Sequence, residues 1–333
     1  AYKKDSYLGG FYTGRDQSEG YNRVAGFDGR WRISGLALAE FHLLGSLTKK
    51  PGEGDTQSGH ALGVRYLYGS REFITDVGIQ DVSRNFQVDT GFLNRQGLTR
   101  LGALALLRFY PQSKFFQRID PFYWSQHILD KESNLFETLN LFTFRVWMPR
   151  SSMFRLDMFL GNEVFAGKRF ARNGIGFKGQ SQLTKHLYLS LYYRRMGGIY
   201  YDPGNPFPGR TDLAFVTLEY QPMEKFTTTL DLTYSDFFRK SDSHKEYDYT
   251  ILRCRTTYQV NKYLFFRGIA EYNFYYKKLF LDALASFTYI PGTVVHVGYG
   301  TVLEKNRWDN TLAEYVPTDR FQQIHRAFFF KVL

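Results

Sequence analysis

The sequence predicts an all-β protein, a transmembrane antiparallel up-and-down β-barrel of about eighteen strands. Three observations lead to this prediction. Phe, Tyr and Trp make up 18% of the 333 residues, yet the mean hydropathy is only −0.38. No stretch approaches the roughly 18 consecutive apolar residues that a membrane-spanning helix needs. Apolar and polar residues instead alternate through many segments of about ten residues or more, a length that crosses a bilayer as a tilted strand.

The clearest alternation lies in residues 226–237. Leu230 and Leu232 fall on one face of the predicted strand, and Asp231 and Thr233 fall on the other. Because successive side chains of a strand point to opposite sides, this pattern gives one lipid-compatible face and one wet face. The same pattern recurs in residues 62–68, 101–109, 154–160, 187–193, 214–220, 252–260 and 264–272. Sixteen strands is the alternative, if the weaker segments 73–80 and 122–129 are not strands.

The connections between the predicted strands alternate between short turns and mostly longer polar loops. The longer loops include residues 81–97, 167–173 and 198–210. An even number of strands with this alternation is typical of bacterial outer-membrane barrels, which have short periplasmic turns and long external loops. We therefore expect one domain over residues 1–333, located in the outer membrane of a Gram-negative bacterium. Membrane lipid and lipopolysaccharide would surround its apolar face.

Aromatic residues support the same assignment. Many Tyr and Trp residues fall next to predicted turns, as in the aromatic girdles of membrane barrels, although aromatic residues also favour strands in general. The chain closes on the alternating aromatics of 328–333, Phe-Phe-Phe-Lys-Val-Leu, which resemble the terminal insertion signal of outer-membrane barrels.

The polar face of the predicted strands is unusually rich in charge. We expect the following bases to face inward: Arg30, Arg32, Arg65, Arg100, Arg108, Arg145, Arg155, Lys178, Arg194, Arg253, Arg255, Arg267 and Lys331. The acids with the same orientation are Asp28, Glu40, Asp76, Asp157, Glu163, Glu219, Asp231, Glu271 and Asp282. In a water-filled pore, this small excess of bases favours anions. The alternative is that the charges pair across strands and fill a closed lumen.

The overall charge of +11 and the pI of about 9.4 do not indicate a nucleic-acid-binding protein. The Lys and Arg residues form no cluster with an RNA- or DNA-binding pattern, so we expect no nucleic-acid partner.

Two loops are candidates for a constriction or a partner contact. The more distinctive is 198–210, which is stiffened by prolines and carries several aromatics: Tyr200, Tyr201, Pro203, Pro206, Phe207 and Pro208. Residues 86–94 of the loop 81–97 have the same two interpretations. Either loop folds inward and narrows a pore, or it stays outside as an ordered external loop.

The sequence contains no catalytic or metal-binding signature. Neither G-x-S-x-G nor H-E-x-x-H occurs, and the seven histidines have no spacing that marks a metal site. His42 shares the inward orientation of Glu40, for which a hydrogen bond inside the lumen is the preferred interpretation. Cys254 is the single cysteine, so no intrachain disulfide forms. We expect no enzymatic activity, no metal and no cofactor.

Four stretches resemble one known family. They are Tyr21–Gly29, Gln87–Arg95, the set Tyr263–Arg267 with Pro291–Thr293 and Val297–Tyr299, and Arg326–Val332. On these residues the chain resembles the C-terminal barrel domain of the DUF5916 family of outer-membrane proteins. The resemblance implies that a domain similar to family 9 carbohydrate-binding modules precedes the barrel and is absent from this chain. It implies no established activity.

Two functions fit these observations. The first is a porin-like channel for small solutes or glycans, which also anchors the upstream carbohydrate-binding-like domain. The second is a structural barrel with an occluded lumen that docks into a larger outer-membrane assembly.

Overall fold

A computed structural model describes residues 5–290, 292–309, 311 and 314–332. Pro291 and Leu333, used above in the family resemblance and the terminal signal, lie outside the described residues. The described part of the chain consists of strands joined by turns and loops, and no helix in it is long and apolar enough to cross a membrane.

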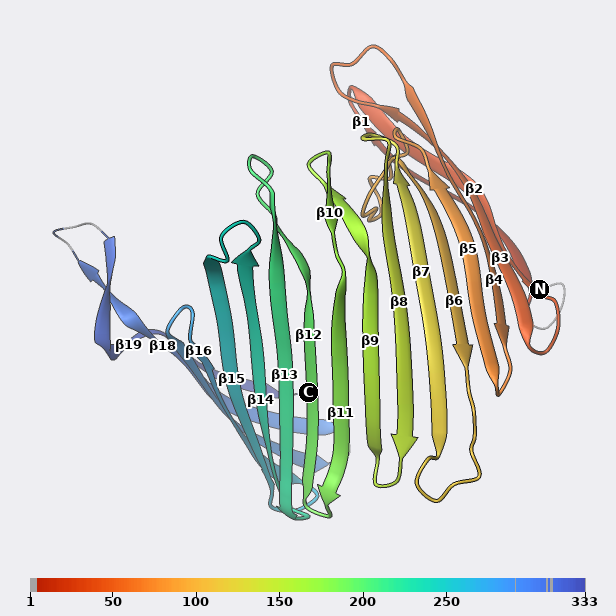
Figure 1. The fold of residues 1–333 in the computed structure, drawn as a ribbon. Coiled ribbons are helices and arrows are strands. Elements are labelled where there is room, and N and C mark those ends of the chain that lie inside the picture. The colour runs from red at the N-terminus through yellow and green to blue at the C-terminus, as the bar shows by residue number, and fades with distance from the viewer. Residues whose placement is uncertain (1–4, 291, 310, 312–313, 333) are drawn as a thin grey trace. The chain divides into compact units, whose positions relative to one another are not determined.

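The strands follow one another along the chain (Figure 1). Their bounds are β1 Tyr7–Gln17, β2 Gly20–Arg32, β3 Ala37–Lys49, β4 Gln57–Gly69, β5 Phe73–Val82, β6 Leu98–Leu107, β7 Arg118–Asp130, β8 Leu135–Met148, β9 Ser152–Phe165, β10 Lys168–Ala171, β11 Gly174–Thr184, β12 Leu187–Tyr200, β13 Phe207–Met223, β14 Phe226–Arg239, β15 Lys245–Gln259, β16 Leu264–Asn273, β17 Lys278–Ile290, β18 Thr293–Asp309 and β19 Glu314–Val332.

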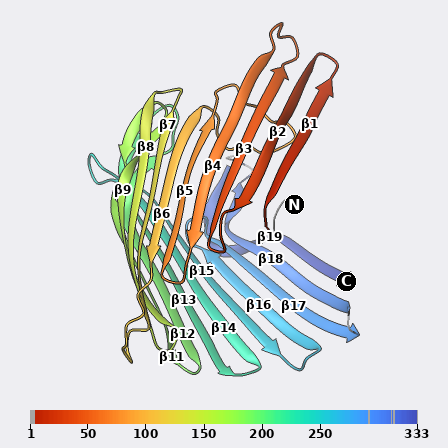
Figure 2. The ribbon, with the colours of Figure 1, turned by 90° about the vertical axis from the view of Figure 1, so that its right-hand side faces the viewer.

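Sequential strands form antiparallel pairs. Continuous registers link β1 to β7. Antiparallel registers also link β13 to β19, with β-bulges or irregularities in the pairs β13–β14, β14–β15, β17–β18 and β18–β19. Figure 2 shows β1 to β6 side by side in chain order. The segments 73–80 and 122–129 lie within β5 and β7, so the sixteen-strand alternative does not apply.

The prediction of a long loop at 167–173 is wrong. Ala166 and Gly167 both have positive φ, 47° and 70°, which is the backbone of a tight two-residue hairpin turn. The turn lets the four residues of β10 pair with the end of β9, in the register Lys168↔Phe165 to Ala171↔Asn162. Both β10 and β11 pair with β9. Counted with β10 as a short extension of β11, the described residues contain eighteen long strands, as predicted.

The chain divides into two compact units. The first comprises Ala1–Val146, Leu156–Ile175 and Met196–Pro208, and the second comprises Trp147–Arg155, Gly176–Arg195 and Gly209–Leu333. The first unit holds the buried hydrophobic cluster on which the candidate site depends. The second unit holds most of β13 and the strands β14 to β19 that follow it.

One face of the sheet in the first unit is apolar and exposed. Cross-strand pairing aligns Phe41, Val64, Ile79 and Leu101 on β3 to β6. These side chains are 42–57% exposed. Exposed aliphatic and aromatic side chains in rows across neighbouring strands are the outward band of a membrane barrel, where hydrocarbon takes the place of water.

This assignment of faces predicts that adjacent substitutions on β6 differ in their effect on the stability of the folded barrel. Leu101→Arg places a charge on the apolar face, and we expect it to destabilise the folded barrel in a bilayer by about 2–4 kcal/mol. Gly102→Arg is the control, because it lies on the opposite face with no atom within 4 Å of an added Cβ. Urea unfolding from lipid vesicles measures the difference. Equal destabilisation by both variants would contradict the assignment.

Candidate functional site

A row of paired charges crosses the other face of β2 to β5. Arg30 lies opposite Glu40, and Glu40 lies opposite Arg65. The Arg30 guanidinium is 2.6 Å from Glu40 Oε1, and Arg65 lies 3.5 Å from Glu40 Oε2. Arg65 Nε also donates to Asp76 Oδ1 over 2.8 Å. The arginines and acids therefore alternate and hold one another in place.

A second row runs parallel to the first and is mostly unpaired. It joins Asp28, His42, Gly63, Gln80 and Arg100 through successive cross-strand pairs. Asp28 is hydrogen-bonded to the Tyr7 hydroxyl. His42, Gln80 and Arg100 have no hydrogen bond or ion pair to another described side chain, and the Arg100 Nε is buried without a partner. These groups are available to a solute.

The two rows border a pocket of about 640 Å³ within the first unit. Three glycines on neighbouring strands, Gly63, Gly78 and Gly102, lie on its floor. An added Cβ at Gly63 would lie 2.3 Å from the His42 ring, so the imidazole lies across this glycine. At Gly102, an added Cβ would meet nothing within 4 Å. The missing side chains hollow out the sheet surface.

Trp124 and Gln126 of β7 complete the lining of the pocket. Trp124 pairs with Leu104 of β6, and Leu104 pairs with Asp76, which places the indole on the charged face. Gln126 pairs with Gly102, so its amide lies beside the open part of the floor.

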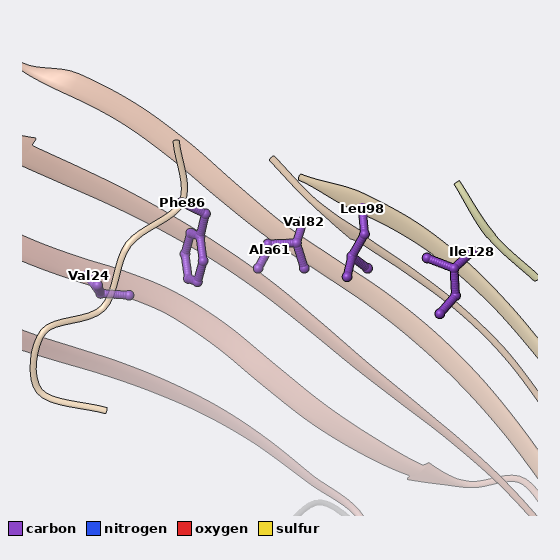
Figure 3. Packing of buried hydrophobic residues seen from close by; sticks show 6 residues of the cluster. All are labelled: Val24, Ala61, Val82, Phe86, Leu98 and Ile128. Atoms are coloured by element: carbon purple, nitrogen blue, oxygen red, sulfur yellow. The ribbon is translucent and has the colours of Figure 1, made fainter. Parts of the chain in front are cut away.

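The loop between β5 and β6, residues 83–97, packs on the same face next to the pocket. Phe86, 3% exposed, inserts among Val24, Ala61, Val82, Leu98 and Ile128, which come from β2 and from β4 to β7 (Figure 3). Val88 and Leu93 of the loop pack against this cluster as well. The loop thus buries its apolar residues on the charged face of the strands of the first unit rather than extending away from them.

Asn22 of β2 fixes the middle of this loop. Its amide nitrogen donates to Thr48 Oγ1 at 2.8 Å and to the Gln87 carbonyl at 2.9 Å. Its oxygen accepts the Asp89 backbone N–H at 2.8 Å. Asn22 is 1% exposed. A single buried amide therefore satisfies both a donor and an acceptor of the loop backbone, and the Ser46 hydroxyl accepts a further bond from the Gln87 N–H.

Arg95 fastens the other end of the loop. Its guanidinium is 2.8 Å from Glu137 and 3.4 Å from Asp130. Burial disfavours the charged form, but the hydrogen bond and attraction to Glu137 outweigh it and raise the pKa of Arg95. Arg84, near the first end, donates to the Lys131 carbonyl.

In the second unit the predicted inward charges again share one face. Asp231 pairs with Arg253, and Arg253 pairs with Glu271. The neighbouring row contains Arg255 beside Thr229, which pairs with Glu219. The contacts of these charges include Arg253–Glu271 at 3.8 Å, Arg267–Asp282 at 3.4 Å and a hydrogen bond from Thr217 Oγ1 to Asp231 at 2.7 Å.

The other predicted site residues have separate surroundings. Arg32 is 3.7 Å from Asp5, and Arg108 follows the end of β6. Asp157 is 1% exposed and accepts from Thr143 Oγ1 at 2.6 Å, and Arg155 lies 5.6 Å from the Tyr192 ring centroid. Arg194 is half-buried on β12.

The loop 198–210 packs on the end of the β9–β10 hairpin. Tyr201 donates to Glu163 over 2.9 Å, and its ring makes an edge contact with Phe165. Tyr200 and Phe207 stack with centroids 4.7 Å apart. Among the prolines, Pro206 is buried, while Pro203 and Pro208 are exposed. Only residues 201–206 lie outside strands, because β12 and β13 extend further than predicted.

Three features of the structure were not predicted: one arginine on the apolar face, the glycines on the pocket floor, and Trp124. Arg195 was not among the inward bases predicted above; it lies on the apolar face of β12, where it donates to Asp212 at 2.6 Å, as does the Tyr193 hydroxyl. The sequence interpretation also overlooked the floor glycines and Trp124. The signal for the floor was present, since a glycine stands on the polar face of three consecutive strands.

The described residues contain no group of three or more His, Cys, Asp or Glu side chains placed to hold a metal ion. The pocket offers the polar groups of His, Gln and Arg together with an indole, a set suited to hydrogen bonding and stacking.

Comparisons with known proteins define the fold. No family model matches the chain, and neither does any curated protein sequence. Among solved structures, the ferric enterobactin receptor PfeA of Pseudomonas aeruginosa aligns with 94% of the chain at 10% identity and a TM-score of 0.52. The copper transporter OprC aligns with 98% at 11% identity and a TM-score of 0.52.

The chain spans 62% of the length of that receptor and 67% of that of the copper transporter. At this level of identity the likeness concerns the fold. The chain has the antiparallel fold of outer-membrane β-barrels, with the apolar band and charged face that such a barrel requires.

The buried amide predicts how the loop is held. Asn22→Ala removes the bonds to the Gln87 carbonyl and the Asp89 N–H. Because Gln87 is half-buried and Asp89 is exposed, we expect a cost of about 0.5–1.5 kcal/mol for each lost bond. We expect faster hydrogen exchange over residues 86–90 and faster tryptic cleavage after Arg84 and Arg95, with the strands still folded. Thr48→Val removes one of the three bonds and should have a smaller effect. Unchanged exchange in Asn22→Ala would contradict this role.

Proposed function

We propose that the protein is a porin-like channel for small solutes, whose charged face lines a water-filled passage. The observation that carries the proposal is the pocket beside the loop 83–97. His42, Gln80 and Arg100 line it without protein partners. All three residues are half-buried, and the Nε atom of Arg100 is fully buried without a hydrogen-bond partner. Since buried polar atoms are nearly always hydrogen-bonded, this atom supports a site for water or a solute.

The loop supports this proposal because it occupies the face that would border the passage. Its apolar residues and the Asn22 bonds hold it there. A loop fixed inside a barrel narrows the opening and sets the size of the solutes that pass. The paired row Arg30–Glu40–Arg65–Asp76 next to it supplies a local field that a permeating ion would experience.

The resemblance to the DUF5916 family adds a second role to the proposal. In that arrangement the barrel anchors an upstream carbohydrate-binding-like domain to the membrane, and glycans handled by that domain are the solutes that enter the passage. The competing function is that of an occluded barrel that docks into a larger assembly. Such a barrel would conduct no ions, whereas a channel would.

Planar bilayer recordings distinguish the two functions. We expect the folded barrel to give steady single-channel conductance, and the reversal potential in a salt gradient to show a preference for anions, because the predicted inward bases outnumber the acids. A barrel that is folded by heat-modifiable migration but gives no conductance would overturn the open passage and support the docking function.

The loop provides an independent test of the passage. Replacing residues 86–94 by a short glycine-serine linker removes the packed segment, and we expect a larger single-channel conductance. The control is a similar shortening within 51–55, an exposed turn between β3 and β4. Equal conductance in the loop variant, the control and the unmodified barrel would show that the loop does not narrow a passage.

A further inference from the structure

We propose that the pocket bordered by His42, Gln80, Arg100, Trp124 and Gln126 is a binding site for an uncharged saccharide of one or two rings. The inference deepens the proposed channel function and rests on it, because a solute reaches this face through the passage. All the lining residues belong to the first unit.

The hydrogen-bonding capacity of the pocket points to a hydroxyl-rich ligand. Arg100 offers only donors, whereas the two glutamines, Gln80 and Gln126, and a neutral His42 each offer donors and acceptors. None of the four is bonded to another described side chain. Each hydroxyl of a sugar donates one bond and accepts others, so it matches such a mixed set better than a phosphate or an ammonium group does.

The charges of the pocket point to a neutral ligand. Arg65 is held between Glu40 and Asp76, so its charge is matched locally. Arg100 is the unpaired base in the lining, and Asp28 lies in the same cross-strand row. The lining contains three acids and two arginines. An anion would find one free guanidinium near three carboxylates, and a cation would meet that guanidinium.

Shape supports the same ligand class. A volume of about 640 Å³ lies within the usual range of small-molecule sites, about 300–1,000 Å³. Trp124 gives one wall a flat aromatic surface, against which the C–H face of a pyranose ring packs. The open floor at Gly102 lets a flat ring approach the strand backbone, since nothing lies within 4 Å of the position that a Cβ would take there.

Calorimetric titration of the detergent-folded barrel tests the proposal without requiring conductance. The probes are glucose, galactose, N-acetylglucosamine, maltose and lactose, with inorganic phosphate as the anionic comparison. We expect saturable binding of at least one sugar and no saturable binding of phosphate. No binding of any sugar, or binding of phosphate in their place, would overturn the proposal.

Two variants place the binding in this pocket. Gly102→Leu fills the open floor, and Trp124→Ala removes the aromatic wall; we expect each to weaken sugar binding by about tenfold or more, a difference of about 1.4 kcal/mol or more. Gly45→Leu is the matched control, because this glycine is equally open but lies on the opposite face of β3. Equal affinity in Gly102→Leu and Gly45→Leu, both shown to be folded, would overturn the assignment.

The same barrels are then recorded in planar bilayers. Sugar binding that interrupts the current supports both the channel and the site. Sugar binding without conductance supports the site and overturns the channel. Conductance without sugar binding overturns the site and leaves the channel function in place.

Discussion

The strict alternation of side chains between the two faces of a hydrogen-bonded strand is the constraint on which this structure depends. A strand in a membrane must pair all its backbone groups with its neighbours, so function has to be built from side chains alone. Each strand here gives one face to the lipid and keeps the other for charge. Because antiparallel neighbours are in register, residues such as Glu40 and Arg65 line up in rows, and the rows provide both rigidity and a polar surface.

The candidate site arises where that polar surface is interrupted. Three glycines remove side chains from the middle of the rows, and the loop 83–97 covers the region next to them. The interruption leaves polar groups such as Arg100 and Gln126 without protein partners, while the surrounding charges remain paired. Binding sites commonly have polar groups without protein partners at their centre, surrounded by side chains that are fixed by their own hydrogen bonds and ion pairs. The surrounding side chains fix the geometry, and the central groups interact with the ligand.

The sequence allowed the fold to be predicted in considerable detail, since a period of two appears directly in the order of residues. The face shared by Asp231, Arg253 and Glu271 follows from that period and from the cross-strand register. The tight turn at Ala166 and Gly167 was missed because Ala166 is an unusual residue at positive φ. The position of the loop 83–97 could not be predicted, because Asn22 and Gln87 are 65 residues apart in the sequence. The alternation of side chains along a strand indicates which face a residue occupies, but not which distant loop it contacts.

The Asn22 contacts also couple the loop to the assembly of the sheet. Asn22 reaches the loop only if β2 lies in its present register, since a shift by one residue would turn its side chain to the opposite face. Phe86 likewise needs Val24, Ala61 and Leu98, from three different strands, to be in place together. The loop therefore docks only when the N-terminal strands are in the correct register. In a barrel whose N-terminal strands are misaligned, the loop stays undocked and accessible to proteases.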